Sequence, residues 1–181
     1  MQESTKKEIF SWVRVFLFIV VAVILIRTFL FTTIMVNGDS MFPTFADKDR
    51  VIVNKVSEIQ RFDMVVFDAP DSDSLYIKRV IGLPGDSIEI KDDILFVNGN
   101  ATEEPYLEEN KQNNEFDYLT DNFSLEELTG EPKVPEGMLF VMGDNRIYSK
   151  DSRNFGFIPK ESLIGEAILQ YLPLKKIGIP K

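Results

Sequence analysis

The sequence predicts a mostly β protein in which an N-terminal transmembrane helix precedes an extracytoplasmic antiparallel β domain with a small irregular insertion. Residues 9–36 are overwhelmingly apolar, and later segments rich in β-branched residues alternate with turn signals. A length of 181 residues suits one anchor plus one compact domain. We therefore divide the chain into a cytoplasmic tail (1–8), an anchor (9–31) and an extracytoplasmic domain (32–181) with an acidic insertion at 101–137.

The apolar segment is long enough to cross a bilayer when it is counted from residue 9 to residue 31. Its uninterrupted core, residues 15–26, is shorter than the roughly 20 residues that a span requires. A cleaved export signal and a buried helix are therefore the alternatives. A cleaved signal should end in a small-x-small site, and residues 29–35 contain none, so a permanent anchor is favoured.

The basic residues near the N-terminus predict the orientation of this anchor. Lys6, Lys7 and Arg14 lie at its N-terminal side, so the tail should stay in the cytoplasm and the chain should cross the plasma membrane once. Ser40 follows Phe31 by nine positions. At about 3.3 Å per residue, that stretch keeps Ser40 within about 30 Å of the outer membrane face.

Seven segments after the anchor have strand composition, and turn signals separate them. The predicted strands cover residues 50–56, 63–67, 75–81, 87–90, 94–97, 138–142 and 164–171. Residues 91–93 resemble a hairpin loop. The insertion is acidic and poor in strand patterning, apart from a helix start at Ser124 with Glu127 completing a capping box. It is interpreted as a solvated surface excursion, and residues 175–181 as a loose end.

Composition excludes several classes of protein. A net charge of -9 and a pI near 4.6 argue against nucleic acid as a partner. The absence of cysteine excludes disulfides and thiol catalysis, and the absence of histidine excludes most catalytic zinc sites and the Ser-His-Asp triad. We expect neither a metal nor a cofactor.

Without histidine, a nucleophilic Ser40 needs another base, and a lysine made neutral by burial is the next candidate. Lys78 lies in the predicted strand 75–81, on the same face as Tyr76 and Val80. The alternative, which is the more common situation for a lone lysine in a strand, is an ordinary edge lysine with its ammonium group in water. The residues alone do not decide between these two interpretations.

Four segments, in this order, resemble the sequence boxes of the type I signal peptidases, and together they extend from residue 34 to residue 159. They are Gly-Asp-Ser-Met-Phe-Pro-Thr (38–44), Arg-Phe-Asp-Met-Val-Val-Phe (61–67), Tyr-Ile-Lys-Arg-Val-Ile-Gly-Leu-Pro-Gly-Asp (76–86) and Gly-Asp-Asn-Arg-Ile-Tyr-Ser-Lys-Asp-Ser-Arg (143–153). One box alone would be weak evidence, whereas four in order are specific. The N-terminal anchor also matches, and the short form resembles enzymes of Gram-positive bacteria.

The resemblance implies a membrane-anchored serine endopeptidase that removes signal peptides from exported preproteins. In that family a serine at the position of Ser40 attacks the scissile carbonyl, and a neutral lysine at Lys78 takes its proton. Ser149 matches a serine that hydrogen-bonds the lysine. The remaining matched residues would brace the site: Asp144, Arg146, Asp151 and Arg153. The alternative for these four is a polar turn with exposed ion pairs.

The resemblance also implies substrate pockets for small side chains one and three positions before the cut. The residues that match pocket positions are Ile34, Val36, Met41, Tyr76 and Ile77, although Ile34 and Val36 could equally be plain core. The expected partners are signal-peptide-bearing preproteins and membrane lipid. One departure concerns Gly38, where some relatives carry a serine whose hydroxyl helps to bind the oxyanion.

Three alternatives remain from other classes. A Ser-Lys self-processing repressor would carry a DNA-binding head instead of an anchor. A non-catalytic membrane-tethered β module, serving as a scaffold or receptor, would need neither Ser40 nor Lys78. An export subunit that has lost catalysis would be expected to lack one of them, and this chain has both.

Overall fold

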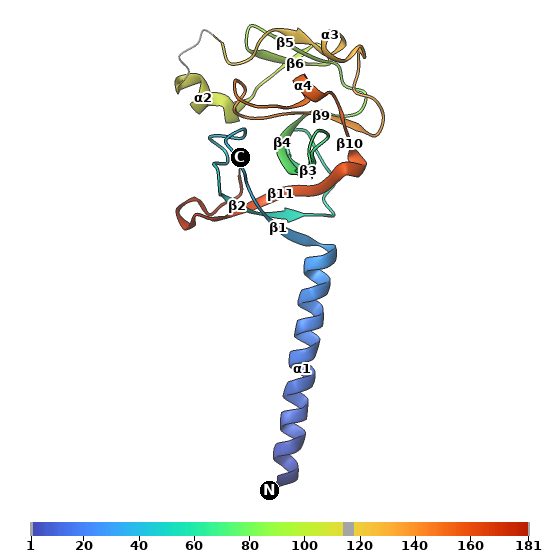
Figure 1. The fold of residues 1–181 in the computed structure, drawn as a ribbon, viewed down its shortest axis with the longest axis vertical. Coiled ribbons are helices and arrows are strands. Elements are labelled where there is room, and N and C mark those ends of the chain that lie inside the picture. The colour runs from blue at the N-terminus through green and yellow to red at the C-terminus, as the bar shows by residue number, and fades with distance from the viewer. Residues whose placement is uncertain (1, 114–117, 181) are drawn as a thin grey trace.

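The computed structural model describes residues 2–113 and 118–180. Met1 of the expected tail, residues 114–117 of the insertion and Lys181 lie outside the described residues. The predicted fold class is confirmed: a long N-terminal helix leads into a domain built from two antiparallel sheets (Figure 1).

Helix α1 (Gln2–Phe29) projects from the domain as a single rod (Figure 1). Of the helices in the described ranges, it is the one long and apolar enough to cross a membrane, over Phe10–Phe29. The helix ends two residues before the expected boundary at residue 31. The Leu30 N–H still donates to the Ile26 carbonyl, but Phe31 begins strand β1 (Phe31–Met35), where the β-branched sequence Thr-Thr-Ile favours extension.

Seven strands form the larger sheet, in the order β1-β2-β11-β3-β4-β9-β10. After β1 these are β2 (Arg50–Asn54), β3 (Met64–Asp68), β4 (Leu75–Gly82), β9 (Met138–Met142), β10 (Ile158–Pro159) and β11 (Leu163–Leu172). Five of them, β2, β3, β4, β9 and β11, correspond to predicted segments, and all neighbouring pairs run antiparallel. Strand β4 lies inside the sheet, so β3 and β9 pair with its two edges, and residues 77–82 are buried on both of its faces.

The smaller sheet lies at the end of the domain away from α1 (Figure 1). Its order is β7-β6-β5-β8, with β5 (Ile88–Lys91), β6 (Ile94–Val97), β7 (Asn100–Thr102) and β8 (Phe123–Ser124). The hairpin between β5 and β6 is confirmed, and Asp92 and Asp93 at its tip have φ of 49° and 60°, as a type I′ turn requires.

The insertion is more ordered than its composition predicts. It contributes β7 and β8 to the smaller sheet, together with the 3-10 helix η1 (Pro105–Leu107) and the helices α2 (Glu108–Asn113) and α3 (Leu125–Thr129). The expectation of an excursion from the sheet was therefore wrong. The capping box of Ser124 and Glu127 at the start of α3 is confirmed.

Three short elements complete the fold: α4 (Ser152–Phe155), η2 (Lys160–Ser162) and η3 (Leu174–Lys176). The C-terminal segment is held more firmly than expected, because Gly178 and Gln170 exchange two backbone hydrogen bonds of 3.1 and 2.9 Å. Three buried apolar clusters form the core. Ile77 belongs to one and Val80 to another, so apolar packing flanks Lys78 along β4.

Candidate functional site

Ser40 and Lys78 meet in the structure. Ser40 is the first residue of a turn in the loop between β1 and β2, and its side chain is half-buried. Lys78 extends from the middle of β4, and its Nζ donates a hydrogen bond of 2.7 Å to Ser40 Oγ. A second hydrogen bond of 3.1 Å joins Nζ to the Ile77 carbonyl. The interpretation of Lys78 as an exposed edge lysine was therefore wrong, since only 3% of this residue is exposed.

Burial changes the acidity of this amine. It lowers the pKa of Lys78 from 10.5 to about 8, because the ammonium form loses hydration inside the protein. The carboxylates of Asp151 and Asp144 offset part of this effect by attracting the positive charge. A substantial fraction of Lys78 is therefore neutral under mildly alkaline conditions, as a general base requires.

A cleft of about 590 Å³ opens beside the two residues. Four of the five expected pocket residues line it: Ile34, Val36, Tyr76 and Ile77. Met41 does not, because its side chain is fully buried and fills the core beneath the cleft together with Val36 and Ile77. Residues that sequence reasoning missed also line the cleft, and these are Met35, Leu75, Tyr148 and Lys150.

The carboxylate of Asp144 is bound by a side chain from the face of β4 opposite Lys78. Arg79, which directly follows Lys78, donates two hydrogen bonds of 2.8 and 2.6 Å to its carboxylate, and both side chains are buried. The Thr44 hydroxyl adds a bond of 2.5 Å. Arg79 was not among the expected site residues, although strand alternation already places it on the face opposite Lys78.

Asp151 caps α4 and is fully buried. Its carboxylate accepts hydrogen bonds from the Gly143 N–H at 2.9 Å and from Arg153 Nε and Nη2, both at 2.8 Å. Burial alone would raise the pKa of Asp151, but Arg153 and the Gly143 N–H hold it below its usual value. Asp151 therefore stays ionised and fixes Gly143 close to Ser40.

The hydroxyl of Ser149 does not make the expected hydrogen bond. Its hydroxyl is buried against Gly143 and the Asp151 carboxylate, but among the described residues it has no partner at hydrogen-bonding geometry. Lys78 is bonded to Ser40 and to the Ile77 carbonyl instead. The expected Ser149–Lys78 hydrogen bond is thus absent from this structure.

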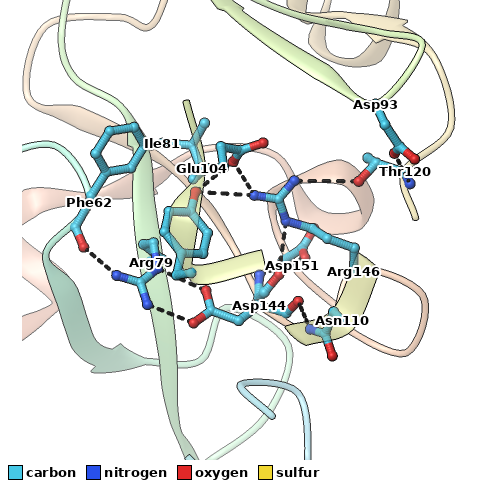
Figure 2. Close-up of polar contacts among 12 residues, drawn as sticks. Phe62, Arg79, Ile81, Asp93, Glu104, Asn110, Thr120, Asp144, Arg146 and Asp151 are labelled. Atoms are coloured by element: carbon cyan, nitrogen blue, oxygen red, sulfur yellow. Dashed lines mark hydrogen bonds and ion pairs between the residues drawn. The ribbon is translucent and has the colours of Figure 1, made fainter. Parts of the chain in front are cut away.

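Arg146 points toward Glu104 and Thr120 of the insertion (Figure 2). Its guanidinium forms a buried ion pair with Glu104, and its Nε donates to the Gly143 carbonyl at 3.1 Å. Glu104 was missed, because a glutamate in an acidic run gives no local sign of a buried partner. The interpretation of this region as an exposed polar turn was wrong, since Asp144, Arg146 and Asp151 are all buried.

Comparisons with known proteins show the family to which the chain is similar. The family described as "Signal peptidase, peptidase S26" matches residues 9–172. Signal peptidase I of Bacillus caldolyticus is 46% identical over 157 residues, covering 84% of this chain and 86% of that protein. Signal peptidase I S of Bacillus subtilis (strain 168) is 42% identical over 182 residues, covering 96% and 95%. A crystal structure of a signal peptidase I from Enterococcus faecalis V583 is 44% identical, with a TM-score of 0.59, and covers 61% of this chain and 97% of that chain.

Proposed function

The chain belongs to the signal peptidases of family S26, which are membrane-bound serine endopeptidases acting on preproteins with signal peptides, and we propose that Ser40 and Lys78 are its catalytic dyad. The observation that carries this proposal is the 2.7 Å hydrogen bond between Lys78 Nζ and Ser40 Oγ, made by an amine whose pKa is lowered by burial.

In the proposed reaction, the neutral amine of Lys78 accepts the hydroxyl proton as Ser40 Oγ attacks the carbonyl carbon of the scissile peptide bond. The resulting ammonium then donates a proton to the departing amine, which leaves an ester between the signal peptide and Ser40. Lys78, neutral again, takes a proton from water as that water attacks the ester. Hydrolysis releases the signal peptide and restores the hydroxyl.

The geometry also supports roles for the neighbouring groups. Asp151, held by Arg153, binds the Gly143 N–H, and Arg146 binds the Gly143 carbonyl. The carboxylate of the next residue, Asp144, is held by Arg79. The Ser40 N–H is the proposed oxyanion donor. The Gly38 N–H is not a ready second donor, because it already donates to Asp47 Oδ1 at 2.8 Å.

The cleft is proposed to bind the residues before the cut, with small side chains one and three positions upstream. A peptide laid along the exposed edge of β1 could gain main-chain hydrogen bonds, and the apolar lining from Ile34, Val36 and Ile77 suits small apolar groups. We further propose that α1 crosses the plasma membrane once, with the N-terminus in the cytoplasm and the domain outside.

The deciding experiment is a cleavage assay of purified full-length protein in detergent with a preprotein that carries a small-x-small site. Ser40→Ala and Lys78→Ala should each abolish turnover without changing the thermal unfolding midpoint greatly. Ser72→Ala and Lys91→Ala, which alter exposed side chains, are the matched controls and should remain active. Turnover that survives in Ser40→Ala would rule out the proposed nucleophile and favour a different role for the domain.

A further inference from the structure

We propose that the acidic insertion is a positioning element for the reaction, and that Asn110 on α2 holds the Ser40 loop in place. This inference rests on the proposed catalytic role of Ser40. It assigns a purpose to a segment that lies outside the four sequence boxes.

Asn110 joins the two segments that meet at the nucleophile. Its Nδ2 donates to the Phe42 carbonyl at 3.0 Å and to the Asp144 carbonyl at 2.8 Å, so both hydrogens of one amide are used. Figure 2 shows the contact with Asp144. Phe42 lies two residues after Ser40, which makes the amide a bridge between the Ser40 loop and the loop after β9.

The same two loops also meet directly. The Asn145 backbone N–H donates to the Ser40 carbonyl at 3.1 Å, and its side-chain amide donates to the Asp39 carbonyl at 3.0 Å. The bonds of Asn145 therefore fix the N-terminal side of the Ser40 turn, whereas Asn110 fixes its C-terminal side. Ser40 lies between these two attachments, so its Oγ stays at one position relative to Lys78.

Buried charges hold α2 where Asn110 can act. Glu104, immediately before η1, pairs with Arg146, and each side chain is at most 3% exposed. The Tyr106 hydroxyl donates to Glu104 at 2.5 Å, and the centroid of the Tyr106 ring lies 3.9 Å from the guanidinium carbon of Arg79. Because α2 directly follows η1, these contacts attach the helix to Arg146, which binds the Gly143 carbonyl, and to Arg79, which binds the Asp144 carboxylate.

Substituting Asn110 tests the inference better than substituting Glu104. Removing Glu104 would leave Arg146 buried without its counter-ion, and such a change destabilises proteins strongly. Asn110 is only half-buried, so water can replace its amide at the two carbonyls. Its loss should therefore cost little stability and should act on the reaction, because misplacing reacting groups by about 1 Å can cost roughly 100-fold in rate.

The experiment compares Asn110→Ala and Asn110→Asp with Gln112→Ala and Gln112→Glu, which make the same changes at an exposed position of α2. Full-length protein in detergent is assayed for kcat and KM with one preprotein, and its thermal unfolding is recorded. We expect kcat to fall by about 10-fold or more in Asn110→Ala and further in Asn110→Asp, which places a carboxylate beside two carbonyls. KM should change by less than about 2-fold, and both Gln112 variants should resemble the wild type.

Two results would overturn the inference. One is an unchanged kcat in both Asn110 variants. The other is a loss of kcat that disappears when the assay is cooled far below the unfolding midpoint, since that would reflect partial unfolding alone. In either case an inactive Ser40→Ala would leave the proposed function intact, so the two failures are distinguishable.

Discussion

The amine of Lys78 lies 2.7 Å from the hydroxyl of Ser40, although 38 positions separate the two residues in the chain. The bond depends on two different supports. Lys78 is placed by an inner strand that is buried on both faces around it, whereas Ser40 is placed by a loop that Asn145 holds through its backbone N–H and its side-chain amide. The acidity of Lys78 and the position of Ser40 relative to it can therefore be tested by separate experiments.

The first prediction concerns pH. Because the neutral form of Lys78 is the proposed base and its pKa is lowered by burial to about 8, kcat should rise about tenfold per pH unit below pH 8 and level off above it. The measurement is the pH dependence of preprotein cleavage by the full-length protein. A profile that still rises toward 10.5, the ordinary value for lysine, would show that Lys78 is not the titrating base.

The second prediction concerns stability. A pKa near 8 instead of 10.5 means that folding disfavours the ammonium form by roughly 3 kcal/mol at pH 7. Lys78→Met should therefore be inactive but about 1–3 kcal/mol more stable at pH 7 by denaturant unfolding. The gain should shrink between pH 8 and 10.5, because there the folded wild type has lost the proton that the unfolded chain still binds, so the stability of the wild type rises with pH.

Lys91→Met, which changes an exposed lysine, is the control for that experiment and should alter stability little at any pH. Lower stability of Lys78→Met at pH 7 would mean that the hydrogen bonds of the amine outweigh its desolvation.

The third prediction concerns Gly143. A Cβ at this position would lie 2.2 Å from Ser149 Oγ and 2.4 Å from the Ser40 carbonyl oxygen, distances that force one of them to move. Gly143→Ala should lose at least about 10-fold in kcat and about 1–3 kcal/mol of stability. Gly178→Ala is the matched control, since nothing lies within 4 Å of the added carbon and its φ is not positive. Wild-type activity in Gly143→Ala would show that the dyad does not depend on this close approach.

The fourth prediction concerns topology. Protease added outside intact spheroplasts should cut the domain, because the proposed orientation places everything after α1 outside the cell. Lys48, whose side chain is 80% exposed, is an accessible site for a trypsin-like protease. Inside-out vesicles should protect the domain. Protection in spheroplasts together with cleavage in inside-out vesicles would reverse the orientation.

The longer strands were predicted well because the apolar pattern that indicates a strand lies within the strand's own sequence. Strands β2, β3, β4 and β9 each bury β-branched or apolar residues, and their sequence composition already shows it. Strands β7 and β8 were missed because three and two residues are too few to show alternation. Strand β1 was partly hidden because its apolar residues continue those of the anchor.

The residues of the site likewise include some that the sequence pattern could place and others that it could not. Alternation along β4 could place Lys78 and Arg79 on opposite faces, but it could not bring Ser40 to Lys78. That expectation came from the family resemblance. Glu104 could not be predicted, since its partner Arg146 lies 42 positions away and a glutamate among acidic neighbours is usually solvated. Met41 was expected to line the cleft but lies in the core. The sequence could not show this, because a turn has no simple periodicity to indicate which side chains face inward.

The junction between α1 and β1 consists of Leu30 alone. The Leu30 carbonyl accepts from the Lys55 N–H at 2.9 Å, and Lys55 Nζ donates to the Thr28 carbonyl at 3.0 Å, so the helix is fastened directly to the large sheet. If α1 spans the bilayer, the cleft has a nearly constant height above the lipid. Selection by such an enzyme would then depend on how far a cleavage site lies from the substrate's own hydrophobic segment, and lengthening the polar spacer between them should move an otherwise acceptable site out of reach.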